Sequence, residues 1–343
     1  MSQINKSTRS KTPMLLSHVF RHCLWGGNRL IGTYTEGVLG HSEPLAELWL
    51  CSTYPGYESR IESGDYKGMT LSELLSNRPE IIGSKYKHLK DIPILIKIID
   101  AKEHLSLQVH PDDDYARENE DEMMGKTELW YVLSAEEGSV VTHGLLHDTD
   151  REELRSWVES GELERHLRKV KVREGDALLI DSGTVHGINA GPIIAEVQEN
   201  SNLTYRIWDY DRRDESGNLR ELHIDKALDV VNCHRCSDIR RPMRQLKYVP
   251  GFSDELMGRC RYFELHRVMI NTDGLSDQND EQRFVSFKTT EESFEVLLCI
   301  EGRSKLSWDD GSISLERGRC TFIPADSKEI SISGKATMLR VLC

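Results

Sequence analysis

Short apolar segments make up most of this chain, and turns rich in Gly, Asp, Asn and Pro separate them. Residues 128–133, 177–180 and 294–300 are examples, and each is long enough for one β-strand. Many such strands at short intervals favour a sandwich or a barrel over a fold in which strands alternate with long helices.

Helical patterns are confined to three stretches. Residues 70–75 begin with Thr70 and Glu73 at the spacing of a capping box. Residues 148–168 and 221–231 carry apolar side chains three and four positions apart, which predicts helices with one buried face. We therefore expect a mainly β protein with a few added helices.

A weak internal repeat indicates how the strands are organised. Residues 173–180 resemble residues 316–323, since each is a charged, Gly-containing turn that enters an apolar strand. A Gly turn, a strand, a short turn and then a histidine resemble the pattern of the cupin jelly roll. The resemblance predicts two cupin barrels. With a boundary near residues 242–251, residues 1–245 form a catalytic unit with helical insertions and residues 246–343 a second, degenerate unit.

The two halves differ in their metal-ligating residues. His186 lies eleven residues after Gly175, whereas Glu329 stands eleven residues after Gly318. Residues 245–343 contain a single histidine, His266. We therefore expect the second unit to be metal-free and any metal chemistry to belong to the first.

Composition narrows the classes of function. The formal charge of −13 over 343 residues argues against binding to nucleic acid or to an anionic membrane surface. An anionic substrate would need a locally basic pocket.

No apolar run approaches the roughly 20 residues that span a bilayer, and the polar N-terminus does not resemble a secretory signal. The eight scattered cysteines suit free thiols, so we expect a cytoplasmic protein. Cys233 and Cys236 form a lone CxxC, and two ordinary thiols are favoured there over a structural zinc site.

The strongest local signal is the segment around His110. Strand alternation places Gln108 and His110 on one face and Leu107 and Val109 on the other. Polar groups directed into an apolar barrel need partners, and a metal ion would supply one. Taken alone, a strand histidine is more often a satisfied core or surface group.

Two further residues complete a candidate ligand set. Glu128 stands at the entrance of an apolar strand, and His186 stands in the turn that follows the strand after Gly175. Each alone would read as a strand-edge charge or a turn residue. Together with His110 they offer two imidazoles and a carboxylate, a donor set that suits Zn²⁺ with a position left open for catalysis.

A longer series of motifs resembles the class I mannose-6-phosphate isomerases of the short bacterial type. The matching segments run in order along the chain: Leu24-Trp25-Gly26-Gly27, Glu47-Leu48-Trp49, Pro93-Ile94-Leu95-Ile96-Lys97, Gln108-Val109-His110-Pro111, Gly125-Lys126-Thr127-Glu128, Gly183-Thr184-Val185-His186 and Thr204-Tyr205-Arg206-Ile207-Trp208-Asp209. The chain departs from the family at Thr127, where Pro is usual, and at Leu50-Cys51, where Glu-Leu is usual.

The resemblance implies a zinc-dependent enzyme with one zinc per chain. It assigns the metal to Gln108, His110, Glu128 and His186. It also places Arg206, Glu196 and Lys126 in the active site as catalytic residues.

The residues themselves, apart from the resemblance, also suggest that this region forms the active site. Glu196 lies in an apolar strand, residues 193–197, so it needs a partner or a raised pKa, unless it is an outward-facing charge. Lys97 also interrupts an apolar run, where a lysine reaching the surface is the ordinary alternative. Lys97, Lys126 and Arg206 would bind the substrate phosphate.

The expected reaction interconverts mannose 6-phosphate and fructose 6-phosphate by proton transfer between C1 and C2 through an enediol. A metal can polarise the substrate oxygens, while a base such as Glu196 holds the proton. Two other classes stay open: a cupin oxygenase or decarboxylase using Fe or Mn, and a double-cupin protein that binds a sugar phosphate without turnover. The sequence leaves the oligomeric state undetermined.

Overall fold

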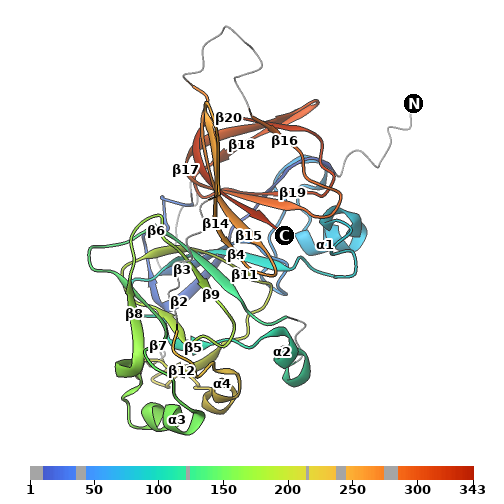
Figure 1. Ribbon diagram of the computed structural model, residues 1–343. Coiled ribbons are helices and arrows are strands. Elements are labelled where there is room, and N and C mark those ends of the chain that lie inside the picture. Colours follow the sequence, from blue (N-terminus) through green and yellow to red (C-terminus); the bar gives the residue numbers. More distant parts are fainter. Residues whose placement is uncertain (1–10, 36–43, 121–123, 214–215, 237–244, 274–284) are drawn as a thin grey trace.

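Strands dominate the computed structural model, which describes residues 11–35, 44–120, 124–213, 216–236, 245–273 and 285–343. They form two units, and in Figure 1 the first unit lies below the second. The predicted fold class, mainly β with cupin units and a few helices, is confirmed. The sequence analysis predicted barrels, but the sheets do not close into barrels. The strands of the first unit are divided between two separate sheets.

The first unit is a sandwich of a six-stranded and a five-stranded sheet. The six-stranded sheet has the order β2 (Val19–Gly27), β3 (Leu45–Cys51), β4 (Ile94–Asp100), β11 (Ile193–Glu199), β6 (Glu128–Ser134) and β9 (Ala177–Ile180). The five-stranded sheet has the order β12 (Tyr205–Trp208), β5 (Leu107–Val109), β10 (His186–Ile188), β7 (Val140–Leu145) and β8 (Leu167–Lys171). An apolar core that includes Trp130, Val141, Ile188 and Ile194 joins the two sheets.

The central strands of the six-stranded sheet are buried on both faces. Every residue of β4 and of β11 is buried. Their second face contributes Ile96 and Ala195 to a core that also holds Leu298 and Leu339 of the second unit. Strands covered on both sides read as continuous apolar runs, and this explains why Lys97 and Glu196 stand out in the sequence.

The second unit is built on one nine-stranded sheet. Its central strands are the long β17 (Glu295–Trp308) and β20 (Ile330–Leu342). The other strands of this sheet are β1 (Met14–Leu16), β13 (Leu246–Val249), β14 (Phe252–Arg259), β15 (Glu264–Asn271), β16 (Val285–Phe287), β18 (Gly311–Glu316) and β19 (Cys320–Ile323). Its core includes Val268, Leu306, Ile332 and Met338.

The N-terminal strand belongs to this second sheet, because β1 pairs with β19 in the register Met14 to Phe322. The predicted boundary at residues 242–251 lies partly outside the described residues. The division into residues 1–245 and 246–343 stays a prediction.

A few short helices accompany the sheets. The α-helices are α1 (Leu71–Asn77), α2 (Asp113–Asn119), α3 (Arg151–Glu159) and α4 (Ile224–Val230), and three short 3-10 helices span Gly64–Tyr66, Pro79–Ile82 and Leu163–His166. The predicted capping box at Thr70 and Glu73 is present. Helices α3 and α4 share an apolar core with β5 and β12, so they cover the outer face of the five-stranded sheet.

One helix prediction needs correction, and one helix was missed. The predicted helix 148–168 is too long, since α3 ends at Glu159, Gly161 takes a φ of +73°, and Leu167 starts β8. Helix α2 was not predicted, although Asp112 caps it by accepting the N–H of Tyr115. None of the helices in the described part of the chain is long and apolar enough to cross a membrane.

Candidate metal centre and active site

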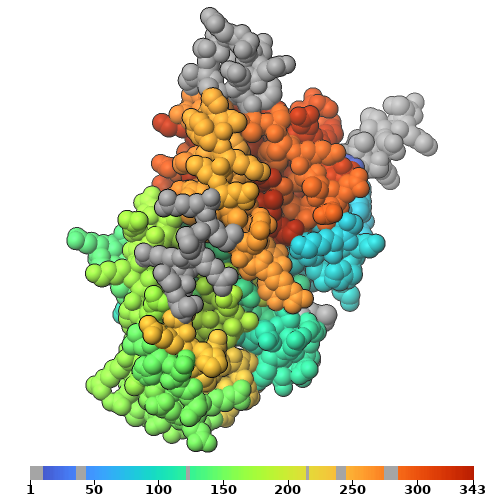
Figure 2. Space-filling model, viewed as in Figure 1, coloured from blue at the N-terminus to red at the C-terminus, as the bar shows by residue number. Residues whose placement is uncertain are grey.

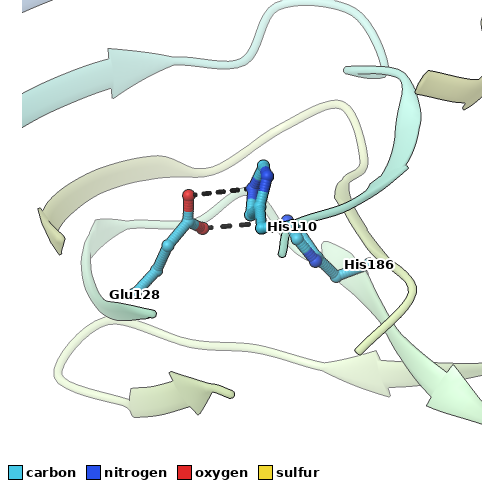
Figure 3. A group of neighbouring side chains, drawn as sticks. All are labelled: His110, Glu128 and His186. Atoms are coloured by element: carbon cyan, nitrogen blue, oxygen red, sulfur yellow. Dashed lines mark ion pairs between the residues drawn. The ribbon is translucent and has the colours of Figure 1, made fainter. Parts of the chain in front are cut away.

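Three side chains meet between the two sheets of the first unit. His110, Glu128 and His186 each offer a ligand atom, and these atoms lie within 4.8 Å of one another. Their exposed fractions are 1%, 0% and 0%. Figure 3 shows both imidazole rings beside the Glu128 carboxylate. The Nε2 of His110 is 3.2 Å from one carboxylate oxygen, and the Nε2 of His186 is 3.7 Å from the other.

The strands position these ligands. Glu128 is the first residue of β6, and His186 is the first residue of β10. His110 follows β5, and Gln108 within β5 pairs directly with His186. The Nε2 of Gln108 is 3.3 Å from the Nε2 of His186. Leu107 and Val109 are buried on the opposite face, as the alternation predicted.

The protonation states suit a ligand role. The Nδ1 of His186 is 2.8 Å from the carbonyl oxygen of Thr184, to which it donates, so the Nε2 keeps its lone pair. Burial lowers the pKa of His186 to about 4. Burial, together with the Lys126 charge, lowers the pKa of His110 to about 3. Both rings are therefore neutral at neutral pH, which is the form that binds metal.

Glu128 is held in its charged form. Burial alone would raise its pKa, but the Lys126 charge and His110 hold it well below its usual range. The Lys126 ammonium contacts the Glu128 carboxylate and lies 3.0 Å from the Nε2 of His110. Two neutral imidazoles and a carboxylate, with Gln108 alongside, fit a divalent metal with nitrogen and oxygen ligands.

A second carboxylate lies next to this group. The indole N–H of Trp130 donates to Glu196 at 2.9 Å and to Glu128 at 3.0 Å, so it joins the two carboxylates. Lys97 lies 3.2 Å from the other Glu196 oxygen, and both side chains are 5% exposed. Burial, with the neighbouring Glu128 charge, raises the pKa of Glu196. The sequence analysis missed Trp130, although it shares a strand face with Glu128.

Arg206 extends the site along the five-stranded sheet. It pairs with Gln108, which pairs with His186, so the three residues form a row across β12, β5 and β10. Arg206 donates to the carbonyl oxygen of Glu221 at 2.8 Å, and burial lowers the pKa of its guanidinium. Among the described residues Asp209 pairs with Arg212 and Arg220, not with Arg206.

These groups open into one cavity of about 300 Å³. The sequence-predicted residues that line it are Lys97, Gln108, Lys126, Glu196 and Arg206. The charged residues that it adds to that prediction are Arg21, Glu47 and Arg220. Five basic and two acidic side chains line the cavity, so it is a basic pocket in an acidic chain. His110, Glu128 and His186 do not line the cavity themselves, but Gln108 and Lys126 of its lining contact them.

Arg21 is held at this pocket by aromatic rings. Its guanidinium carbon lies 4.0 Å from the ring centre of Tyr57 and 5.3 Å from that of Trp49. Within the described part of the chain no carboxylate lies within ion-pair distance of Arg21. Alternation along β2 could have pointed to it, because Arg21, Cys23 and Trp25 all line the pocket.

The remaining candidate ligands lie elsewhere. The Sγ of Cys236 is 3.1 Å from the Nδ1 of His143, and neither Cys233 nor Cys236 joins a group of three candidate ligands in the described ranges. In the second unit, Glu329 is exposed and His266 contacts Asp254 at 2.6 Å. No metal-ligand group is found among the described residues of that unit.

Comparison with known proteins gives the family. Residues 14–162 match the catalytic domain of type I phosphomannose isomerases, and residues 257–343 match the cupin domain of mannose-6-phosphate isomerases. The mannose-6-phosphate isomerase ManA of Bacillus subtilis is 32% identical over 328 residues, which cover 94% of this chain and 96% of ManA. The chain belongs to the mannose-6-phosphate isomerase family. The predicted enzyme class, an isomerase of this family, is thereby confirmed.

Other members of the mannose-6-phosphate isomerase family agree. The enzyme of Streptococcus mutans is 40% identical over 220 residues, which cover 64% of this chain and 67% of that enzyme. The crystal structure of the Bacillus subtilis enzyme superposes with a TM-score of 0.86 at 31% identity, and covers 97% of this chain and 100% of that one. The apo form of the Salmonella typhimurium enzyme shares the fold, with 16% identity and a TM-score of 0.72 over 96% of this chain and 98% of that one.

Proposed function

We propose that the chain interconverts mannose 6-phosphate and fructose 6-phosphate, with one zinc ion held by Gln108, His110, Glu128 and His186. The observation that carries this proposal is the buried group of His110, Glu128 and His186, which contacts Lys126 and Gln108 in the lining of a basic pocket. When bound, zinc would act as a Lewis acid toward the substrate carbonyl and hydroxyl oxygens. The Lys126 ammonium pairs with Glu128 and lies 3.0 Å from the Nε2 of His110, so it would supply positive charge beside the metal ligands.

The protein groups divide the remaining work. Glu196, with its raised pKa, takes the proton from one substrate carbon and returns it to the other. Lys97 and Trp130 hold its carboxylate in place through one oxygen each. Arg206 stabilises the negative charge that develops on the enediol oxygens. Lys97, Lys126 and Arg206 attract the phosphate.

A coupled assay tests the proposal. The chain is stripped with a chelator, then reloaded with Zn²⁺, and fructose 6-phosphate formation from mannose 6-phosphate is followed. We expect turnover with zinc and none without it. Tight binding of the sugar phosphate without turnover would instead indicate a binding protein. Release of CO₂ or consumption of O₂ would indicate a decarboxylase or an oxygenase.

A further inference from the structure

The backbone that leads into β6 carries both Lys126 and Glu128, and side chains outside the metal group hold it. The N–H of Gly125 donates to Asp113 at 2.9 Å, and the N–H of Thr127 donates to Glu199 at 2.7 Å. A Cβ on Gly125 would lie 2.4 Å from the backbone of Asp112, so the segment is also tightly enclosed. Two carboxyl groups thus fix the backbone on both sides of Lys126.

The two carboxyl groups interact with each other. Glu199 is 1% exposed, and its Oε1 has no donor among the described residues. A proton on this oxygen would make it a donor, and the neighbouring Asp113 carboxylate is the acceptor that its charge favours. Burial, and then the bond to Asp113, raise the pKa of Glu199 to about 8. Burial alone would raise the pKa of Asp113, but its bonds from Gly125 and Glu199 lower it.

The second unit reaches this pair. Tyr262 lies in the turn between β14 and β15, and its hydroxyl donates to the second oxygen of Asp113 at 3.0 Å. Phe263 beside it is 2% exposed in the core shared by both units. In Figure 2 the orange tip of this hairpin lies against the teal segment that includes α2. Close contact between Gly258 of β14 and Leu129 of β6 fixes the approach of the hairpin.

We propose that Asp113, Glu199 and Tyr262 are positioning residues, through which the second unit fixes the segment that presents Lys126 and Glu128. The proposal rests on the proposed function, since it assigns a role to these residues in that same site. None of the three lines the pocket, so they act through the backbone of Gly125 to Thr127. Ionisation of Glu199 would place two carboxylates side by side and release this segment.

The groups that face the pair add little compensating charge. Glu199 faces Asp113, the Tyr262 hydroxyl and the Cys260 thiol. The positive charges nearby act on its neighbours, that of Arg117 on Asp113 and that of Arg261 on Tyr262. The unfolded chain loses the Glu199 proton near the usual value of 4.5, and the folded chain near 8. The folded state therefore binds the extra proton in this window. The contribution of Glu199 to the free energy of unfolding therefore falls as the pH rises from 4.5 to 8. Above pH 8 this contribution no longer changes with pH.

Glu199→Gln and Glu199→Ala in the zinc-loaded full chain test the proposal. The Gln amide donates to Asp113 and its oxygen accepts from Thr127, so it copies the protonated acid. We expect kcat of Glu199→Gln near the parent value at neutral pH, with its alkaline loss of activity moved to higher pH. Glu199→Ala should lower kcat by about tenfold, the usual scale for residues that orient a metal site. Of the two Glu199 variants, only Glu199→Ala should show faster amide hydrogen exchange at Gly125 and Thr127.

Tyr262→Phe tests the link between the units, with Tyr86→Phe as its control. The Tyr86 hydroxyl contacts the backbone of Tyr262 at 3.5 Å and does not contact Asp113. Tyr262→Phe should speed exchange at Gly125, whereas Tyr86→Phe should not. An alkaline limb shared by parent and Glu199→Gln, or unchanged exchange in both Glu199→Ala and Tyr262→Phe, would overturn the proposal. If the parent lacks isomerase activity, the proposed function fails, while the exchange measurements still decide the positioning role.

Discussion

His186 shows how one ring is prepared as a ligand. Its Nδ1–H donates to Thr184, and its Nε2 faces Glu128 from a fully buried position. Because the apolar cores of the sandwich do not depend on this ring, we expect His186→Ala to fold, to lose bound zinc and to lose turnover. His234→Ala, at an 83% exposed side chain, is the matched control and should keep both. Normal zinc content in His186→Ala, measured by elemental analysis, would show that the ligand assignment is wrong.

Arg206 could act in two ways: by stabilising negative charge in the transition state or by binding the substrate phosphate. If it stabilises charge that appears only in the transition state, Arg206→Ala should keep its zinc and lose about 10²-fold in kcat. This is the result that we expect from its place in the row with Gln108 and His186. Arg165→Ala, at a 77% exposed position, should change neither parameter.

Steady-state kinetics on the zinc-loaded Arg206→Ala variant give the answer. A rise in KM with kcat unchanged would assign Arg206 to uniform binding of the phosphate instead. Parameters within about twofold of the parent, far below the effect of a catalytic donor, would remove Arg206 from the mechanism.

Local patterns predicted the candidate ligands that the structure brings together, but not the groups that surround them. Alternation along β5 was enough to place Gln108 and His110 on one face. The neighbours of Glu196 could not be predicted in this way, since Trp130 reaches it only because β6 and β11 pair in the observed register. Interactions across strands depend on register, which a single sequence does not specify.

At the scale of elements, β2 brings its alternate residues to the pocket. The guanidinium of Arg21 lies over the rings of Tyr57 and Trp49, which hold it without a carboxylate partner in the described ranges. Such a group suits a phosphate, and a charge-assisted hydrogen bond contributes about 1.5–3 kcal/mol. We expect Arg21→Gln to raise KM for the sugar phosphate about tenfold or more and to leave zinc content unchanged.

The control for Arg21 is Arg173→Gln, at an 87% exposed side chain outside the pocket. Inhibition by inorganic phosphate provides a second readout, because it reports the anion site without the sugar. Unchanged KM and unchanged phosphate inhibition in Arg21→Gln would exclude it from phosphate binding.

Elements also show where prediction from periodicity ends. The apolar spacing of residues 148–168 continues past Gly161, but the left-handed conformation there ends the helix and Leu167 packs as the start of a strand. Apolar side chains that follow one another at helical spacing can therefore belong to two elements. Helix α2 was missed for the opposite reason, since Ala116 is its only buried residue and its apolar pattern is weak.

At the scale of the whole molecule, the two units are unequal in chemistry but share one core. The cluster that contains Ile96 and Ala195 of the first unit also contains Leu298 and Leu339 of the second. The repeat in the sequence predicted two related units. It could not predict that β1 joins the second sheet, because that pairing links residues more than three hundred positions apart.

The unequal ligand sets of the two units lead to a prediction of stoichiometry. In the described residues one group of three buried ligands is present, and it lies in the first unit. The purified chain should therefore bind one zinc tightly, as measured by elemental analysis after dialysis.

Because the metal binds the folded site, zinc at a thousand times its Kd should stabilise the fold by about 4 kcal/mol. Chelation should accordingly lower Tm and abolish turnover together, and readdition of zinc should restore both. His186→Ala provides the control, since its Tm should no longer respond to zinc. Two tightly held metals per chain would contradict the prediction, and in that case loss of one metal on Cys236→Ser would point to the CxxC pair as the second site.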